Sequence, residues 1–512
     1  MDYIVPAWHQ LLNDWSFTVP HLEFDDATNQ LQLFQSGKTG IGLLVTDYQP
    51  YLITKLGQLA LSPQRVLSVF DYLQGINHLD GHTVSYRDLR WPADAFMEFG
   101  NFHLIVWRQN RRYAEVVYDT QGRIIWVDYY GDHDRVQRRL RFDSRGFVSR
   151  AAIYHGKTVA QHIYYDEQGH WRFKHDLATD AVMINPTYQG KLAHQCYDHL
   201  NDLIAEVVFQ NFLPKLRKTH GRLVISVDNH ATVDQRKLGK QLPTIYSVSH
   251  WHAYDQVLPR LDKNLSRLVV DSQATGEQVT KLLPDQEVSP VLIPPFYSQF
   301  QLGHSQQVRE QRLALFAENI DLATLSHLLE LLYKRLFKRA KQEQLYIFTY
   351  SQISDASAKQ ALRQLCDRHQ GEFLLYTKQL AQMLRLRDQK FLKLPILHIK
   401  VVRLASVADA LKYLDKIRVI IDWSPVPDEF FQMISVSMGI PQIQRQSTAE
   451  VQDHQNGLIC QKMSQLNSAL DYYLKNLRNW NVALINDVRV LNRNSSQQLL
   501  AKWRQAWKQG EY

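Results

Sequence analysis

The pattern of apolar and polar positions opens with a strand, a helix and a second strand. In residues 1–78, short apolar runs at residues 3–5 and 41–45 flank a helical pattern over residues 25–35. This order predicts the first βαβ unit of a doubly wound domain, in which helices cover a parallel sheet. We therefore assign residues 1–78 to the first part of a Rossmann-like domain.

The pattern changes in residues 79–189, where β-branched and aromatic residues alternate as in antiparallel strands. An aromatic residue, Asp, two polar residues and Gly recur at residues 118–122, 142–146 and 165–169, so the spacings are 24 and 23 residues. Asp bonds to its local backbone and Gly permits positive φ, so each repeat predicts one hairpin turn. We expect an inserted antiparallel β-meander that has no chemistry of its own and an exposed face suited to docking.

Strands and helices alternate again in residues 190–303, which we assign to the second part of the first Rossmann-like domain. Buried strands are predicted at residues 223–227, 244–248, 267–270 and 291–293, the last of which ends at two prolines. A polar stretch over residues 298–310 predicts a linker.

A second Rossmann-like domain is predicted over residues 304–490. Its candidate strands are residues 345–348, 373–376, 396–399 and 419–422. Two doubly wound domains that face each other enclose a cleft at the carboxyl ends of their strands. The predicted fold class is therefore α/β and GT-B-like: two doubly wound Rossmann-type domains, with the antiparallel β-meander inserted in the first.

Two leucine- and tryptophan-rich patterns predict the last helices. One helix is expected to carry Leu466, Leu470, Leu474 and Leu477 on a single face. The final helix, within residues 491–512, presents Leu499, Trp503 and Trp507 at i, i+4 and i+8. We expect this stripe to pack back across the first domain.

Composition narrows the class of protein. The chain has 512 residues, 45% hydrophobic and 21% charged, which is ordinary for a folded protein of two or three domains. No run approaches the ~18–20 apolar residues that span a bilayer, and no signal peptide is expected at the start. Cys196, Cys366 and Cys460 are too few and too far apart for a disulfide framework or a zinc knuckle. A reducing cytoplasm is the expected location.

The net charge of +8 favours an acidic partner, either nucleic acid or the anionic inner face of a membrane. The densest basic run, residues 334–341, falls on a predicted helix. A solvated helix face is the preferred interpretation, and a membrane-surface patch is the alternative. Because basic and aromatic residues form no recognisable recognition module, nucleic acid is not expected as a partner.

Two stretches resemble catalytic motifs without completing them. Residues 36–39 read Ser-Gly-Lys-Thr like the end of a P-loop, but Gln32 stands where the first glycine of that loop is required. A turn is therefore predicted. His250 and His252 would share one face of a strand as a metal pair, but Tyr254 occupies the position where an acid is wanted, and no carboxylate cluster is evident. No metal-binding residue is assigned, and no Gly-x-Ser-x-Gly elbow argues for a hydrolase.

The most informative stretch is residues 421–442, which read as strand, loop, helix and a Gly-x-Pro entry into the next strand. It resembles the donor-binding signature of retaining GT-B glycosyltransferases, which places two Glu residues eight positions apart. Counted back from Gly439, these positions fall on Val426 and Ile434. Asp428 and Glu429 are out of register, and we interpret them as helix N-terminal acids that complement the helix dipole.

The resemblance therefore implies a fold that has lost its chemistry. The family's carboxylates orient the donor sugar and bind the ribose. Branched apolar residues would leave those polar ligand groups unpaired, at a cost of about 1–3 kcal/mol each. We accordingly assign no catalytic and no cofactor-binding residue and expect no cofactor.

A more specific resemblance covers nearly the whole chain. Residues 24–31, 48–52 and 68–76, with Gly-Ile-Pro-Gln-Ile at 439–443, are similar to the first accessory secretory protein of the accessory Sec system in Gram-positive bacteria. The resemblance implies a GT-B-like protein without transferase activity, in a cytoplasmic complex with two sibling accessory proteins. The further partners that it implies are a dedicated Sec motor ATPase, its channel and a glycosylated serine-rich repeat adhesin. From the net charge we add weak peripheral contact with the inner face of the plasma membrane.

Two alternatives stay open at this point. The chain could be an active retaining glycosyltransferase that modifies the adhesin before export, using Asp428 and Glu429. It could also be the chaperone subunit of a glycosyltransferase pair, since such subunits share both the fold and the insert.

Overall fold

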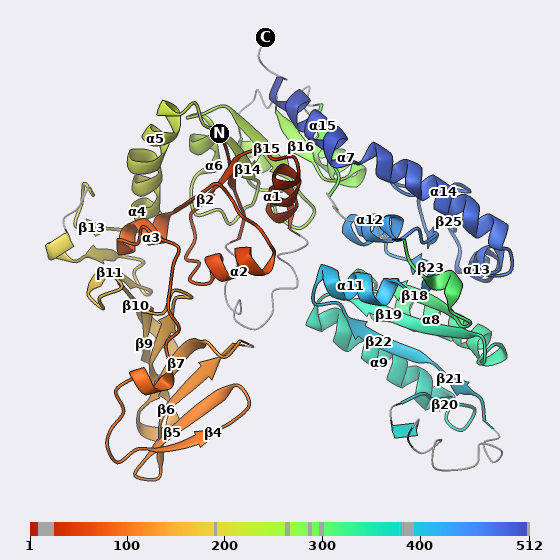
Figure 1. Cartoon of the computed structure of the whole chain (residues 1–512), viewed down its shortest axis with the longest axis horizontal. Helices are drawn as coiled ribbons and strands as arrows, with labels where there is room; N and C mark the ends of the chain where they lie inside the picture. The colour runs from red at the N-terminus through yellow and green to blue at the C-terminus, as the bar shows by residue number, and fades with distance from the viewer. Residues whose placement is uncertain are drawn as a thin grey trace.

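The computed structural model describes residues 1–8, 25–119, 121–188, 192–261, 267–284, 289–295, 302–377, 379–380, 382 and 394–508. These residues form two α/β lobes, and a long antiparallel sheet extends from the first of them (Figure 1). The predicted fold class is confirmed.

The first lobe is built on a seven-stranded, fully parallel sheet in the order β17-β16-β15-β14-β1-β2-β3. Its strands are β1 (Asp2–Val5), β2 (Ile41–Val45), β3 (Arg65–Ser68), β14 (Arg222–Ser226), β15 (Thr244–Val248), β16 (Leu268–Val270) and β17 (Val291–Leu292). Its helices are α1 (Asp26–Ser36), α2 (Leu52–Gln58), α3 (Val69–Gln74), α4 (Leu200–Glu206), α5 (Leu213–Lys218), α6 (Gln235–Gly239) and α7 (Gln273–Leu282). The sheet is made by both halves of the first domain, because β1 pairs with β14 across more than 200 residues.

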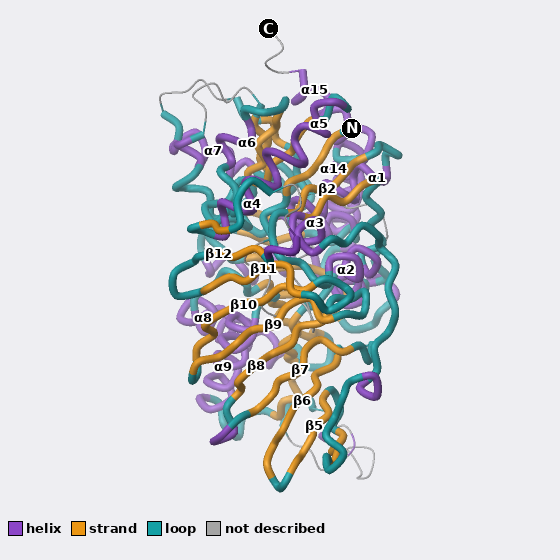
Figure 2. The backbone as a smooth tube through the Cα atoms, turned by 90° about the vertical axis from the view of Figure 1, so that its left-hand side faces the viewer, coloured by secondary structure: helices purple, strands orange, loops and turns teal. Residues whose placement is uncertain are grey.

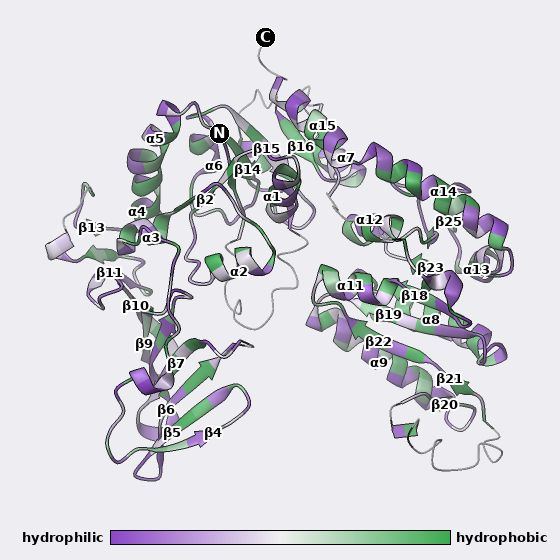
Figure 3. Ribbon diagram, in the orientation of Figure 1, coloured by the Kyte–Doolittle hydropathy of each residue, from purple (hydrophilic) through white to green (hydrophobic). Residues whose placement is uncertain are grey.

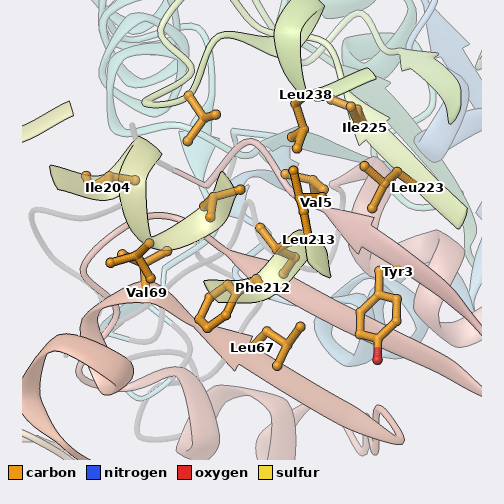
Figure 4. Packing of buried hydrophobic residues seen from close by; sticks show 14 of the residues in the cluster. Tyr3, Val5, Leu67, Val69, Ile204, Phe212, Leu213, Leu223, Ile225 and Leu238 are labelled. Atoms are coloured by element: carbon orange, nitrogen blue, oxygen red, sulfur yellow. The ribbon is translucent and has the colours of Figure 1, made fainter. Parts of the chain in front are cut away.

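The core of this lobe lies between the sheet and the helix pair α4–α5. Figure 4 shows Val5, Leu223 and Ile225 of the central strands meeting Phe212 and Leu213. All five side chains are buried, since alternate residues of a parallel strand face a helix layer. Val207–Phe212 between the two helices is a π-helix.

The inserted sheet has ten antiparallel strands in sequence order. In Figure 2 the labelled strands β5 to β12 follow one another along the sheet. They are β4 (Phe96–Phe99), β5 (His103–Arg108), β6 (Arg111–Tyr118), β7 (Ile124–Tyr130), β8 (Val136–Phe142), β9 (Val148–His155), β10 (Thr158–Tyr165), β11 (Trp171–Asp176), β12 (Val182–Ile184) and β13 (Cys196–Tyr197). β13 continues the sheet beyond residue 189, the predicted end of the insert.

The repeated turns behave as the sequence predicts. Gly122, Gly146 and Gly169 have φ angles of 80°, 93° and 82°, and each follows the aspartate of its own hairpin turn. Asp119 and Asp166 each accept hydrogen bonds from two backbone N–H groups of their own turn. The prediction of one hairpin per repeat is confirmed.

The second lobe is a six-stranded parallel sheet in the order β22-β19-β18-β23-β24-β25. Its strands are β18 (Gln311–Phe316), β19 (Glu343–Thr349), β22 (Ile399–Arg403), β23 (Ile417–Asp422), β24 (Gln442–Gln444) and β25 (Gly457–Ile459). Its helices are α8 (Leu322–Lys338), α9 (Gln352–Arg368), α11 (Val407–Leu414), α12 (Glu429–Ser437), α13 (Leu466–Leu474) and α14 (Leu477–Arg493). In Figure 3 the strands of the lobe are largely hydrophobic and its helices mixed, as expected for a sheet with helices on both faces.

Three details of the second lobe differ from the prediction. The central strand β18 was not predicted, because it begins with Gln311 and Arg312 directly after the polar stretch. The candidate strands at residues 373–376 and 396–399 pair in a separate two-stranded sheet, β20 (Leu374–Leu375) and β21 (Ile396–Leu397), and only β22 joins the main sheet. The helix expected over residues 466–477 is two helices, because Asn476 caps a new one.

The last helix, α15 (Ser496–Lys508), leaves the second lobe and packs on the first (Figure 1). Leu499, Trp503 and Trp507 are all buried there against α1, and the ring centroids of Trp503 and Phe34 lie 5.5 Å apart. The two lobes are thus joined by the end of the chain as well as by the segment between them. The polar stretch at residues 298–310 lies partly outside the described residues; within it Ser305–Gln307 is a 3-10 turn.

The basic run at residues 334–341 is not one solvated face. Arg335 is buried and donates to both carboxylate oxygens of Glu343, at 2.7 and 2.8 Å. Arg339 also donates to Glu343, at 3.0 Å. Lys334 and Lys338 are exposed. No helix in the described part of the chain has the length and apolar character needed to cross a membrane.

Candidate functional site: the cleft between the two lobes

A cleft of about 590 Å³ opens where the carboxyl ends of the first-lobe strands face the second lobe. Its first-lobe side is formed by the turn after β15 and by α7, and its second-lobe side by the loop before α12. This is where doubly wound folds bind ligands, because loops at the carboxyl ends of parallel strands leave a crevice. The lining residues are His250, His252, Ala253, Tyr254, Asp255, Gln278, Lys281, Leu282, Asn319, Val426, Pro427 and Asp428.

His250 forms an electrostatic bridge between the two lobes. Its Nδ1 lies 2.7 Å from Oδ2 of Asp271, which follows β16, and its Nε2 lies 3.8 Å from Oδ2 of Asp428 in the second lobe. Burial disfavours the imidazolium, but the charges of Asp271 and Asp428 outweigh it and hold the pKa of His250 well above its ordinary value. His250 is therefore a cation clamped between one carboxylate of each lobe.

Asp271 is fully committed to this arrangement. It accepts hydrogen bonds from the hydroxyl groups of Ser249 and Thr275, at 2.7 and 2.6 Å. Burial would raise its pKa, but His250 and these hydroxyls lower the pKa to about 2. It stays ionised at neutral pH and so keeps its bond to His250.

On the second lobe, Asp428 is the N-cap of α12. Its carboxylate accepts the backbone N–H of Phe431 at 2.7 Å and the hydroxyl of Tyr350 at 3.3 Å. Its own N–H donates to Asp422 at the end of β23, at 3.2 Å. The interpretation of Asp428 as a helix N-terminal acid is confirmed.

Glu429 also lies in the first turn of α12, as the sequence predicts. It is 6% exposed, and burial raises its pKa well above the ordinary value, with the charges of Asp271 and Glu450 adding to the effect. The side chain of Ser272 in the first lobe partly offsets this rise in the pKa, so Glu429 belongs to the contact between the lobes.

The two positions of the donor-site carboxylates lie in different environments. Ile434 is fully buried in the core between α12 and the sheet, where a carboxylate would be desolvated. Val426 is 45% exposed and lines the cleft. Neither side chain can bond to a hydroxyl, and the two nearest acids, Asp428 and Glu429, already contact Tyr350, His250 and Ser272.

The two histidines of the rejected metal pair do not share a strand. They lie in the turn after β15, and each meets a different set of carboxylates. His252 has Nε2 at 2.9 Å from Asp26 and 3.3 Å from Asp25, with Nδ1 at 3.5 Å from Asp228. The expectation that no carboxylate cluster accompanies these histidines is wrong, because the start of α1 and the segment after β14 supply one around His252.

The Ser-Gly-Lys-Thr stretch is a turn, as predicted. It follows the end of α1 rather than preceding a helix, and Lys38 adopts φ 53° between Ser36 and β2. A phosphate-binding loop would instead point its amides from a helix N-terminus.

Comparison with known proteins places the chain in a family. A model of the family of accessory Sec system proteins called accessory secretory protein 1 matches residues 5–510. The chain belongs to this family. It is 28% identical over 539 residues to the member from Streptococcus gordonii, with 98% of each chain covered, and 25% identical over 521 residues to that from Staphylococcus aureus, covering 98% and 97%.

Solved structures share the fold over the full length. The chain in a crystal structure of accessory secretory proteins 1, 2 and 3 in Streptococcus pneumoniae has a TM-score of 0.76 at 22% identity, covering 99% of this chain and 98% of that one. One from the Glycosylation Associate Protein complex of Streptococcus agalactiae reaches 0.78 at 23% identity, covering 99% and 100%. The pneumococcal O-GlcNAc transferase GtfA, solved with UDP and GlcNAc, reaches 0.71 at 11% identity, covering 99% and 98%. The GT-B architecture is thus shared by family members and by transferases.

Proposed function

We propose that this chain is a non-catalytic component of the accessory Sec export system, required to transport a glycosylated serine-rich repeat adhesin to the cell surface. Its membership of the accessory secretory protein 1 family, over residues 5–510, carries this proposal. The replacement of both donor-site carboxylates by Val426 and Ile434 supports the non-catalytic part.

The second lobe offers physical support for the proposed loss of sugar transfer. A retaining transferase needs polar groups that bind the donor more strongly in the transition state than in the ground state. At Ile434 the side chain serves the hydrophobic core instead. Asp428 and Glu429 serve the contact between lobes, so they are not free to replace the missing pair.

We propose the two sibling accessory secretory proteins as stable partners. The motor ATPase and channel are proposed as later partners, and the adhesin as the cargo. One solved relative comes from a structure whose name includes accessory secretory proteins 1, 2 and 3, which supports the first part. The antiparallel insert, predicted as residues 79–189, is proposed as a separate domain that offers a docking surface. In the proposed division it interrupts the first Rossmann-like domain, residues 1–78 and 190–303, and the second Rossmann-like domain follows at residues 304–490.

We further propose a cytoplasmic location with weak contact at the inner face of the membrane, supported by the net charge of +8. Lys334, Lys338 and Lys341 are the exposed cations of the basic run, and the first two lie on α8. Replacing Lys334 and Lys338 by Gln should weaken binding to anionic vesicles, whereas Arg335 must be left intact because it is buried with Glu343. Unchanged vesicle binding by the double variant would remove this patch from the proposal.

The test of the non-catalytic role is turnover of a sugar nucleotide. The purified full chain, incubated with UDP-linked N-acetylglucosamine and the adhesin, should release no UDP above the rate without protein. An active transferase of the same fold serves as the positive control. Release of UDP that is lost in Asp428→Asn and in Glu429→Gln would establish the transferase alternative. Stable co-purification with a catalytic transferase, and not with the sibling export proteins, would favour the chaperone alternative.

A further inference from the structure

The cluster around His252 lies at the edge of the cleft and takes no part in the proposed function. Its four side chains come from three segments: Asp25 and Asp26 at the start of α1, Asp228 after β14, and His252 after β15. They are only 4%, 8%, 2% and 7% exposed, respectively. Three carboxylates and one imidazole are thus buried together at the carboxyl edge of the first sheet.

A proton on His252 does not satisfy these groups. Nε2 carries one hydrogen at most, and Asp26 Oδ1 at 2.9 Å takes it. Asp25 Oδ1, 3.3 Å from the same nitrogen, has no hydrogen-bond donor among the described residues. A buried carboxylate oxygen without a hydrogen-bond donor destabilises the fold, and a bound cation would remove this cost at Asp25 Oδ1.

The ligand atoms are spaced for a metal ion. One atom each of Asp25, Asp26 and His252 lies within 4.8 Å of the others. With bonds of about 2.0–2.2 Å to an imidazole nitrogen and carboxylate oxygens, the separations of 2.9 and 3.3 Å correspond to angles of roughly 90° and 105° at the ion. These lie in the range of octahedral and tetrahedral coordination.

The surrounding groups are placed as metal sites require. The hydroxyls of Ser226 and Ser247 donate to Asp26 at 3.0 and 2.9 Å, and Trp8 Nε1 donates to Asp25 at 2.8 Å, which fixes both carboxylates. Asp228 faces Nδ1 of His252, the nitrogen that would not touch the ion. A carboxylate behind a ligating imidazole sets its tautomer and raises its basicity. His252 also lines the cleft, which gives an ion a path of entry.

We infer that Asp25, Asp26 and His252 bind one divalent transition-metal ion of the Zn²⁺ type, with Asp228 positioning the imidazole. Mixed nitrogen and oxygen ligands suit such an ion better than Ca²⁺ or Mg²⁺, which prefer oxygen alone. The ion would tie the start of α1 to the turns after β14 and β15, beside the cleft. This inference is independent of the export role.

The experiment is calorimetric titration of Zn²⁺ into the purified full chain after dialysis against a chelator, with metal content checked by mass spectrometry. One ion per chain is expected. Asp25→Asn and His252→Gln should abolish the tight site, and Asp228→Asn should weaken it by about 10–100-fold. His175→Gln is the matched control, because His175 is also a buried histidine beside a carboxylate, 2.6 Å from Asp180 in the meander. It should bind Zn²⁺ as the wild type does.

A second measurement covers variants that fail to fold. Co²⁺ added to the wild-type chain should give visible absorption bands that Zn²⁺ removes at one equivalent. The proposal is overturned if the wild type takes up no stoichiometric ion and shows no bands, because the cluster then holds a proton between Asp25 and Asp26. The proposal is equally overturned if folded Asp25→Asn and His252→Gln bind Zn²⁺ as tightly as the wild type does. It is also overturned if His175→Gln loses as much Zn²⁺ affinity as these two variants.

Discussion

Removal of the Trp503 side chain should release the last helix from the first lobe. Trp503 is 2% exposed and lies between Leu499 and Trp507 on the face of α15 that packs on α1. A buried tryptophan removes about 150–250 Å² from water, and at about 25 cal/mol per Å² this gives ~4–6 kcal/mol. Measured Trp→Ala costs of about 3–5 kcal/mol agree, so we take ~4 kcal/mol for Trp503→Ala. A loss of this size shifts the ratio of docked to detached helix by about 1000-fold.

Limited proteolysis measures this shift, because a detached α15 exposes the Asn494–Ser495 junction that follows α14. Trp503→Ala should be cut there much faster than the wild type. Gln505→Ala, at an exposed position of the same helix, should be cut at the wild-type rate. Combining Trp503→Ala with Phe34→Ala should show a coupling of about 0.5–1.5 kcal/mol in unfolding experiments, since their rings touch. Equal protease rates for Trp503→Ala and Gln505→Ala would refute the docking of α15.

Three further predictions concern single side chains. Arg335→Gln should lower the free energy of unfolding by about 3 kcal/mol, because the buried Glu343 loses its bidentate partner and keeps only the single bond from Arg339. The exposed Lys334→Gln should be within ~0.5 kcal/mol of wild type in denaturant titrations. Burial, with the nearby charge of Asp428, raises the pKa of Asp422 to about 6. The folded state therefore holds this proton more tightly than the unfolded state, so the stability that it contributes below pH ~4 is lost, by ~3 kcal/mol, as the pH rises through 6. Asp422→Asn should remove that loss from the pH dependence of the free energy of unfolding. An identical pH slope in the variant and the wild type would contradict this. Gly146→Ala should destabilise the protein more than Gly122→Ala. Both glycines have positive φ, but only at residue 146 would the added Cβ meet a backbone oxygen, that of His82, at 2.1 Å. Equal thermal midpoints for the two variants would contradict this.

Periodic features of the sequence predicted most of the fold. The buried runs at β1, β2 and β15 contain mainly apolar and β-branched residues, so they read as central strands. The Asp and Gly of each meander turn identified the hairpins, because backbone conformation there depends on local chemistry. β18 escaped because its first two residues are polar, although it lies at the centre of its sheet.

The site was harder to predict, because its contacts join residues far apart in the sequence. The register of Val426 and Ile434 could be counted from Gly439, since one helix carries that spacing. No local pattern shows that His252 meets Asp26 across 226 residues, or that His250 reaches Asp428. Likewise, the basic run gave no sign that Arg335 points inward, because its partner Glu343 lies on the following strand.

The most direct test of the export role is deletion of the gene in its native host, followed by assay of the adhesin in medium, cell wall and cytoplasm. A plasmid copy of the wild-type gene provides the control. The account predicts adhesin that is normally glycosylated but retained inside the cell. Adhesin that reaches the surface with its glycosylation reduced would contradict the account, and would assign the chain to sugar transfer.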